Sequence, residues 1–279
     1  MLRVELPDPG EVGRLYDRFT DLGDAALGDN LHFGYWEDPD VVDPDDTLQA
    51  ATHRFTDRMA DRLRVTSGHR VLDVGCGVGA PAVRLAAATG AEVVGITVSS
   101  EQVDRATGLA RAQGMAERVA FRLADVLDLP FGDASFDAVW ALESLCHVPD
   151  RGAALENMAR VLRPGGRLVL TDFYQRAPIP AEKRPVVEEY FRDFMMSPMV
   201  GPDGYPRLFE EAGLLFHEQL DISRETMPRT FALMSQGIRQ RKGDLDERFG
   251  AEMVDQFDPG DLIGIPEFGY LVAVAERAS

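Results

Sequence analysis

The sequence predicts an α/β fold in which helices cover both faces of a mostly parallel β-sheet. From residue 70 onward, short apolar runs alternate with amphipathic helical patterns, which is typical of parallel strands joined by crossover helices. The glycine-rich segment 71–79, VLDVGCGVG, joins the first apolar run directly to a helical pattern. The chain has 279 residues, 45% of them hydrophobic, which is enough for the core of one large domain.

The apolar runs predict strands at 70–74, 92–96, 119–123, 136–140, 167–171, 214–222 and 270–276. Between the second and third strands, Ser99 and Gln102 form a capping box for a helix that ends near Ala112. A helix over roughly 153–162 is followed by the sequence RPGG, which predicts a turn into the fifth strand. The last run is almost continuously apolar, and this predicts a central position in the sheet.

Two irregular segments interrupt the alternation, at about 174–206 and 224–266, and they are predicted to form a helical cap on a domain spanning 67–279. Helical patterns within and beside these segments cover 186–194, 207–212, 230–241 and 245–257. The first segment also contains Met195, Met196 and Met199. Methionines line adaptable apolar pockets, and they also pack cores, so both roles stay open for these three.

Residues 1–66 are predicted to form a separate N-terminal unit with two helices. Leu15, Tyr16 and Phe19 mark the first helix, and the second covers 47–63. The loop between the helices contains His32, Phe33, Tyr35 and Trp36. These side chains either pack on the domain or form a lid over a ligand, and their clustering within acidic loop sequence favours the lid.

The composition excludes several classes of partner. There are 29 basic and 47 acidic residues, a net charge of −18, and an acidic surface repels nucleic acids and anionic membranes. Two cysteines, Cys76 and Cys146, predict neither a disulfide framework nor a metal site. No apolar run approaches the roughly 20 residues of a membrane helix, and the N-terminus lacks the features of a signal peptide. We therefore expect a cytoplasmic protein with a small-molecule substrate, and a homo-oligomer is an open alternative to a monomer.

The segment 71–79 predicts a nucleotide-like ligand. An apolar strand ends in Asp73, and Gly75, Gly77 and Gly79 follow at alternate positions. Glycines let the backbone approach a ligand closely, and the start of the next helix offers unpaired N–H groups to an anion. The third glycine comes one position earlier than in the dinucleotide fingerprint G-x-G-x-x-G. The second strand ends in Thr97 where nicotinamide enzymes usually carry an acid, so a nicotinamide cofactor is disfavoured.

The pattern D-x-G-x-G-x-G resembles the first motif of class I S-adenosylmethionine (SAM) dependent methyltransferases. The stretch LPFGDASFDAVWALESLCHVPDRGAALENMARVLRPGGRLVLTDF resembles the later motifs of that family in order and spacing, so that the resemblance covers residues 65–173. It implies a Rossmann-like fold, with a seven-stranded, mostly parallel sheet whose last strand is antiparallel, and SAM as cofactor. The phrases NLHFGYWED and FDAVWALESL resemble actinobacterial natural-product methyltransferases, including the rebeccamycin-type sugar O-methyltransferases.

The same resemblance implies a set of cofactor contacts. Asp125 is expected to accept a hydrogen bond from the adenine amino group, with Val126 against the ring. Gln102 is expected either to bind the ribose or methionine end or only to cap its helix, and Tyr16 is a candidate for the cofactor carboxylate. The predicted cofactor-binding residues are Tyr16, Asp73, Gly75, Gly77, Gly79, Thr97, Gln102, Asp125, Val126 and Ala141.

A hydroxyl acceptor benefits from a general base near the transferred methyl group. Candidates at the carboxyl ends of strands four and five are Glu143, Cys146, His147 and Asp172. The sugar O-methyltransferases that the chain resembles carry two successive histidines here, and this sequence has Cys146 in place of the first. We expect His147 to act as base with Asp172 as its partner, while structural roles for both stay open. A Cys146 thiolate is disfavoured as base, because an isolated thiol has a pKa of about 8.5.

The predicted function is therefore methyl transfer to a small secondary metabolite, with a hydroxyl of a glycosylated or polyketide-type compound as the acceptor. Two alternatives stay open. One is a cyclase that retains SAM without methyl transfer, which the replacement of a family histidine by Cys146 keeps open, and the other is a C-methyltransferase. A non-catalytic SAM-binding protein is disfavoured by the predicted cap.

Overall fold

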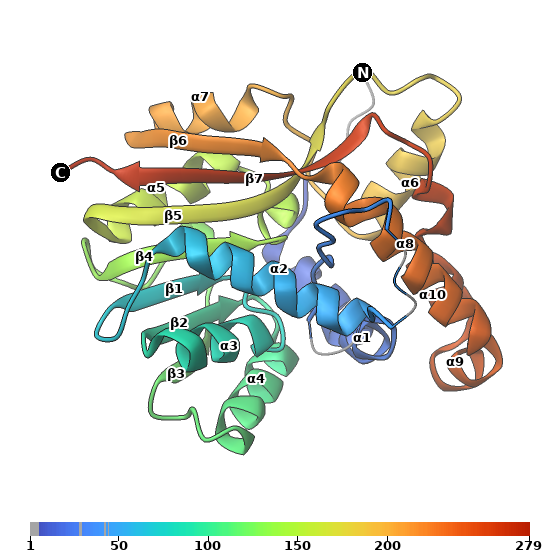
Figure 1. The fold of residues 1–279 in the computed structure, drawn as a ribbon, viewed down its shortest axis with the longest axis horizontal. Coiled ribbons are helices and arrows are strands. Elements are labelled where there is room, and N and C mark those ends of the chain that lie inside the picture. The colour runs from blue at the N-terminus through green and yellow to red at the C-terminus, as the bar shows by residue number, and fades with distance from the viewer. Residues whose placement is uncertain (1–5, 28–29, 42, 44) are drawn as a thin grey trace.

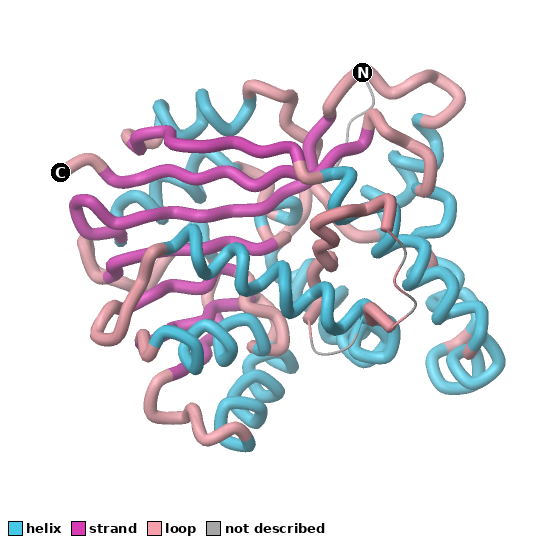
Figure 2. The backbone as a smooth tube through the Cα atoms, in the orientation of Figure 1, coloured by secondary structure: helices cyan, strands magenta, loops and turns pink. Residues whose placement is uncertain are grey.

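Seven strands form one sheet at the centre of the molecule, in the order β3-β2-β1-β4-β5-β7-β6 (Figures 1 and 2). The computed structural model describes residues 6–27, 30–41, 43 and 45–279. The strands are β1 (Arg70–Val74), β2 (Glu92–Thr97), β3 (Val119–Leu123), β4 (Phe136–Leu142), β5 (Leu162–Gln175), β6 (Leu214–Asp221) and β7 (Phe268–Arg277). Strands β1 to β5 pair in parallel, and β7 is antiparallel to β5 and β6. The predicted sheet, with its antiparallel last strand, is confirmed.

Strand β7 lies inside the sheet, between β5 and β6, as its apolar run predicts. Strand β5 differs from the prediction because it begins at Leu162 and includes the RPGG sequence, which was expected to be a turn. Phe136 pairs with Leu162 and Ala138 pairs with Arg167, so residues 163–166 form an irregularity within the pairing. The turn residues thus interrupt the strand register without ending the strand.

Helices cover both faces of the sheet. On one face, α2 (Leu48–Leu63), α3 (Ala80–Thr89) and α4 (Ser100–Ala112) share a core with alternate residues of the strands. On the other face, α5 (Arg151–Val161) and α7 (Gly204–Glu211) bury a second set, which includes Leu72 and Leu170. Adjacent residues of each central strand face opposite cores, since side chains alternate along a strand.

The cap consists of α6 (Arg184–Asp193), α8 (Ser223–Gln240), α9 (Lys242–Phe249) and α10 (Ala251–Phe257), which gather beyond one end of the sheet (Figure 1). The single helix expected over 245–257 is wrong, because Gly250 has a φ of 87° and separates α9 from α10. This left-handed conformation suits glycine and breaks the helical hydrogen-bond pattern. Helix α8 begins seven residues before the predicted 230 and contains Pro228.

The N-terminal residues pack against the rest of the chain. Helix α1 (Pro9–Leu27) contacts α4 and α8, and Phe33 and Phe55 belong to the same core as the sheet. His32 and Trp36 of the aromatic loop are buried, and Trp36 lies beneath the guanidinium of Arg229. The expectation that the N-terminus is not a signal peptide concerns residues 1–5, which lie outside the described residues. Among the described helices, none is long and apolar enough to cross a membrane.

Candidate functional site

Two adjoining cavities open at the carboxyl ends of the parallel strands, where strand order reverses between β1 and β4. Counted together with the solvent-open space at their mouths, the first cavity encloses about 1020 Å³ and the second about 760 Å³. Four residues line both cavities and therefore mark their junction: Tyr16, Leu31, Glu143 and His147.

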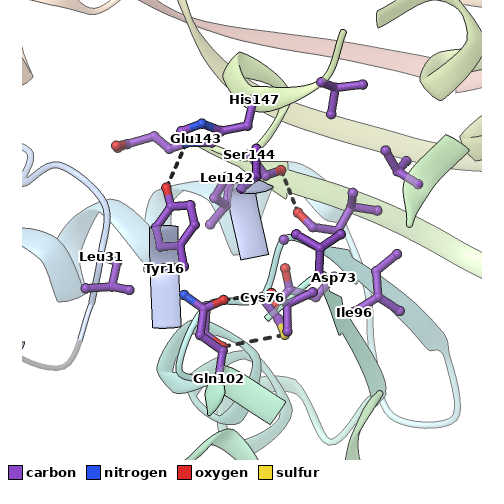
Figure 3. A pocket seen from close by; sticks show the side chains of 18 of the residues that line it. Tyr16, Leu31, Asp73, Cys76, Ile96, Gln102, Leu142, Glu143, Ser144 and His147 are labelled. Carbon is purple, nitrogen blue, oxygen red and sulfur yellow. Dashed lines mark hydrogen bonds between the residues drawn. The ribbon is translucent and has the colours of Figure 1, made fainter. Parts of the chain in front are cut away.

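Most of the predicted cofactor residues line the first cavity: Tyr16, Asp73, Gly75, Gly77, Thr97, Gln102, Asp125 and Val126 (Figure 3 labels several of them). Gly79 and Ala141 are not among its lining residues. A Cβ on Gly79 would lie 2.6 Å from the ring of Phe121 and 2.7 Å from Ala106, so this glycine allows α3 to pack closely against β3 and α4. Ala141 is fully buried within β4.

The glycine-rich turn is held by its backbone. The N–H groups of Gly75 and Cys76 both donate to the carbonyl of Ile96, at 2.8 and 2.9 Å. Gly75 has a φ of 76°, and a Cβ there would lie 2.2 Å from the Cβ of Ser144. The turn therefore presents bare backbone to the cavity, and only glycine fits at its first position.

Asp73 provides a buried carboxylate at the floor of the first cavity. Its Oδ2 atom has no hydrogen-bond partner among the described residues. Burial raises the pKa of this carboxyl to about 7. An unpaired buried carboxylate is costly, so this position fits a ligand that brings a positive charge or N–H donors.

Three other predicted positions, Thr97, Gln102 and Asp125, line the cavity and also stabilise the local structure. Thr97 Oγ1 donates to Gln102 Oε1 at 2.7 Å, and the backbone N–H of Gln102 donates to Ser99 at 3.1 Å. The predicted cap is present, and the Gln102 side chain also lines the cavity. Asp125 accepts the N–H of Leu127 through one carboxylate oxygen at 2.9 Å, which holds Val126 at the cavity wall.

The second cavity is mainly aromatic and apolar. Its walls come from α1, the aromatic loop, the segment after β4, the strand β5 and the cap. They include Phe19, Phe33, Phe173, Tyr190, Phe194, Met196, Phe231, Met234 and Phe257. Among its described lining residues, none is Lys or Arg. Met196 lies in this wall, in agreement with the pocket role left open for the methionines.

His147 lies at the junction of the two cavities. Its Nδ1 is 3.2 Å from the carbonyl oxygen of Met195, and its Nε2 is 2.7 Å from the hydroxyl of Tyr16 (Figure 3). A carbonyl oxygen only accepts, so Nδ1 carries the proton and Nε2 is the basic nitrogen that accepts from Tyr16. Burial lowers the pKa of this imidazole, which is therefore neutral at pH 7.

Glu143 and Cys146 complete the junction. Glu143 Oε1 accepts from the N–H of Phe33 and from the hydroxyl of Tyr270, both at 2.6 Å. Burial raises the pKa of this carboxyl to about 8. The Cys146 thiol lies 3.3 Å from the carbonyl of Glu143, and burial raises its pKa well above the usual range. A thiolate base is therefore excluded at neutral pH.

Asp172 lies away from both cavities, contrary to the expectation that it assists the base directly. It is completely buried, and its carboxylate accepts from Arg151 at 2.8 Å, from the N–H of Phe173 at 2.8 Å and from the hydroxyl of Tyr205. Arg151 also donates to the carbonyl of Pro198 at 2.9 Å. This network anchors the segment that carries Met195, the hydrogen-bond partner of His147. The charge of Asp172 also acts to raise the pKa of His147, but burial outweighs it.

Several lining residues have no signal in the sequence. Ser144 packs against the glycine turn and donates to the carbonyl of Val74 at 2.6 Å, and Val12 and Leu31 close the first cavity from the N-terminal segment. No motif marks them, because small apolar residues and serine are common everywhere. Among the described residues, no group of His, Cys, Asp or Glu is arranged to hold a metal ion.

Comparison with known proteins defines the class. A family model described as a methyltransferase domain matches residues 72–170, which span the glycine turn and His147. The methyltransferase GfsG of Streptomyces halstedii is 42% identical over 96% of this chain and 94% of its own length. The 27-O-demethylrifamycin SV methyltransferase of Amycolatopsis mediterranei is 46% identical over 80% of each chain. The crystal structure of the [4+2]-cyclase SpnF superposes with a TM-score of 0.82 at 29% identity, over 99% of this chain and 98% of that one.

The fold and the two cavities define a class I SAM-dependent methyltransferase. The chain belongs to the methyltransferase family that GfsG and the rifamycin enzyme represent, and it is of the natural-product type. The predicted resemblance is confirmed at this level. SAM is the cofactor, and the first cavity suits it, since the buried Oδ2 atom of Asp73 has no hydrogen-bond partner among the described residues.

The raised pKa of Asp73 predicts a pH-dependent affinity for SAM. If the carboxylate pairs with the positively charged cofactor, affinity should rise about tenfold between pH 6 and pH 8, as a group with a pKa near 7 ionises. Isothermal titration calorimetry of SAM across this range checks the slope. Glu143 lines the same cavity and also titrates here, so D73N serves as the control. An identical slope in D73N would remove Asp73 from cofactor recognition.

Proposed function

We propose that this enzyme methylates a hydroxyl group of a bulky, apolar natural product, of the polyketide or glycosylated type. The observation that carries the proposal is the neutral imidazole of His147 at the junction of the two cavities. Its basic Nε2 accepts from Tyr16, which also lines both cavities. Bound SAM supplies an electrophilic methyl group, and His147 accepts the proton that the acceptor hydroxyl loses.

The second cavity supports an uncharged acceptor. Its aromatic and methionine walls favour ring systems and apolar chains, and the absence of Lys and Arg among its described lining residues gives no partner for a phosphate or carboxylate. The name of the rifamycin relative describes an acceptor lacking a methyl group at an oxygen, which agrees with O-methylation. As part of this proposal, the predicted binding residues hold SAM in the first cavity, and the second cavity holds the acceptor.

The test uses the purified protein with SAM and 27-O-demethylrifamycin SV, together with a panel of hydroxylated macrolide aglycones. Mass spectrometry should show a product heavier by one methylene and an equal amount of S-adenosylhomocysteine. A protein that binds SAM tightly in calorimetry and converts none of these acceptors would contradict the proposal. Cleavage of the new methyl by an ether-specific reagent distinguishes O- from C-methylation.

A cyclase is the second candidate, because the SpnF structure matches nearly the whole chain. A cyclisation would use the apolar cavity to hold a folded polyene and would need no base. It predicts a product isomeric with its substrate and no S-adenosylhomocysteine, so the same mass spectra separate the two functions.

A further inference from the structure

We propose that Tyr16 relays the proton of the acceptor hydroxyl to His147, and that docking of helix α1 on α4 sets this relay in place. The inference rests on the proposed O-methylation and concerns the path of the proton. The observations that carry it are the Tyr16–His147 hydrogen bond and the polar contacts that fix α1 over the cofactor cavity.

The basic nitrogen of His147 is already occupied. Nδ1 carries its proton toward the carbonyl of Met195, so Nε2 has a single lone pair, and the hydroxyl of Tyr16 donates to it at 2.7 Å. The two rings meet edge to face, with centroids 5.3 Å apart. An acceptor hydroxyl therefore reaches Nε2 either by displacing the phenol or by passing its proton through the phenol oxygen.

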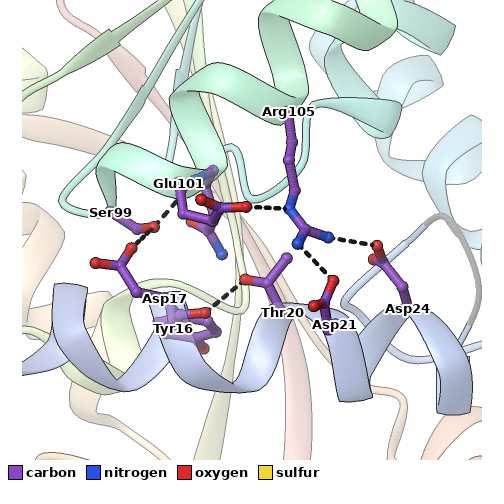
Figure 4. Close-up of polar contacts among 9 residues, drawn as sticks. Tyr16, Asp17, Thr20, Asp21, Asp24, Ser99, Glu101 and Arg105 are labelled. Atoms are coloured by element: carbon purple, nitrogen blue, oxygen red, sulfur yellow. Dashed lines mark hydrogen bonds and ion pairs between the residues drawn. The ribbon is translucent and has the colours of Figure 1, made fainter.

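Displacement requires Tyr16 to move, and α1 holds it in place. Asp17 accepts from Ser99 at 2.5 Å, and Arg105 of α4 donates to Asp21 and Asp24 at 2.5 and 3.1 Å (Figure 4). These contacts lie on α1 within eight residues of Tyr16. Displacement would also leave the phenol without its partner in an apolar cavity.

Close packing restricts the helix further. A Cβ on Gly13 would lie 2.4 Å from the carbonyl oxygen of Val98, so α1 touches the end of β2 directly. The side chain of Thr20 donates back to the carbonyl of Tyr16 at 2.6 Å. Pro9 and Val12 of the same helix line the first cavity, so one helix both covers this cavity and places Tyr16 on His147.

In the relay, the acceptor O–H bond breaks and its proton passes to Tyr16 Oη. At the same time, the proton already on Tyr16 passes to His147 Nε2, which becomes an imidazolium. The acceptor oxygen forms a bond to the methyl carbon as that carbon leaves sulfur, so the products are the methyl ether and S-adenosylhomocysteine. The phenol ends as it began. Burial holds the pKa of Tyr16 well above its usual value, so the phenol transfers a proton without persisting as phenolate.

The decisive variant is Tyr16→Phe, which keeps the ring and removes the hydroxyl. With 27-O-demethylrifamycin SV as the acceptor, kcat should fall by about 10²-fold, the usual size of a proton-transfer contribution, with little change in KM. The double variant with His147→Ala should be no slower than the slower single variant, because the two groups act in series. Tyr174→Phe, which removes a phenol outside both cavities, is the matched control and should keep the wild-type rate.

Two further measurements do not depend on turnover. In calorimetry, Tyr16→Phe should bind SAM with wild-type affinity. In ¹⁵N NMR of histidine-labelled protein, the Nε2 resonance of His147 should move toward the value of a nitrogen without a hydrogen-bond donor. Both results would support the proton path.

Several results would overturn the relay. A variant with wild-type kcat would show that the proton does not pass through Tyr16. Loss of SAM affinity with unchanged kcat at saturation would make Tyr16 a ligand of the cofactor, as the sequence suggested. Absence of product from the wild-type protein would contradict the proposed O-methylation itself, and the relay with it.

Discussion

Gly75→Ala is expected to abolish SAM binding. The new Cβ would lie 2.2 Å from the Cβ of Ser144, and the residue would have to hold a φ of 76°, which L-residues rarely adopt. The turn must shift to relieve this contact, and the shift displaces the backbone that lines the cofactor cavity. Calorimetry should show no heat of binding at SAM concentrations that saturate the wild-type protein.

The matched control is Gly108→Ala. Gly108 lies within α4, and a Cβ there meets nothing within 4 Å. Since glycine costs a helix interior about 0.5–1 kcal/mol relative to alanine, this variant should be slightly more stable and bind SAM normally. Circular dichroism establishes that Gly75→Ala is folded. A folded Gly75→Ala protein with wild-type affinity would mean that the turn does not form the cofactor site.

His147→Ala is expected to reduce the rate of O-methylation by about 10²-fold or more, because it removes the group that takes the acceptor proton. The effect should fall on kcat, since the substitution leaves the glycine turn and Asp73 unchanged. Rapid-quench measurements of a single turnover with saturating SAM would isolate the chemical step.

His217→Ala provides the control, because His217 is exposed on β6 and pairs with Glu276 outside both cavities. The pH profile adds a second check. Burial lowers the pKa of His147, and the base acts in its neutral form, so the rate should decline with acidification only below the usual histidine pKa of about 6.5. An unchanged rate in His147→Ala would remove this residue from the mechanism.

The sequence predicted the sheet well because the spacing of apolar residues and the turn-forming residues between the strands are local signals. The apolar runs between residues 70 and 142 located four strands to within two residues, and an unbroken run placed β7 inside the sheet. The prediction failed where local signals were ambiguous. RPGG is a turn sequence that β5 incorporates as an irregularity, and Gly250 divides a continuous helical pattern into α9 and α10.

In the candidate site, too, local features were predictable from the sequence and long-range contacts were not. Asp73 and the first two glycines lie within five residues of each other on one strand end, so their joint position at the cavity follows from the chain itself. Gly79 belongs to the same motif, but the side chains it contacts, Phe121 and Ala106, lie far along the sequence. The motif therefore identified the turn, but it did not separate the glycines that line the cavity from the one that permits helix packing.

The sequence by itself determined the class of this protein: a parallel sheet, the glycine turn of a SAM-dependent methyltransferase, and a histidine after the fourth strand. Only the tertiary structure decided which groups lie together. Tyr16 meets His147 across 131 residues of sequence, and Asp172 pairs with Arg151 instead of His147. Contacts of this kind depend on how α1 and the cap pack on the sheet, and packing is set by the summed burial of many side chains, which no local pattern records.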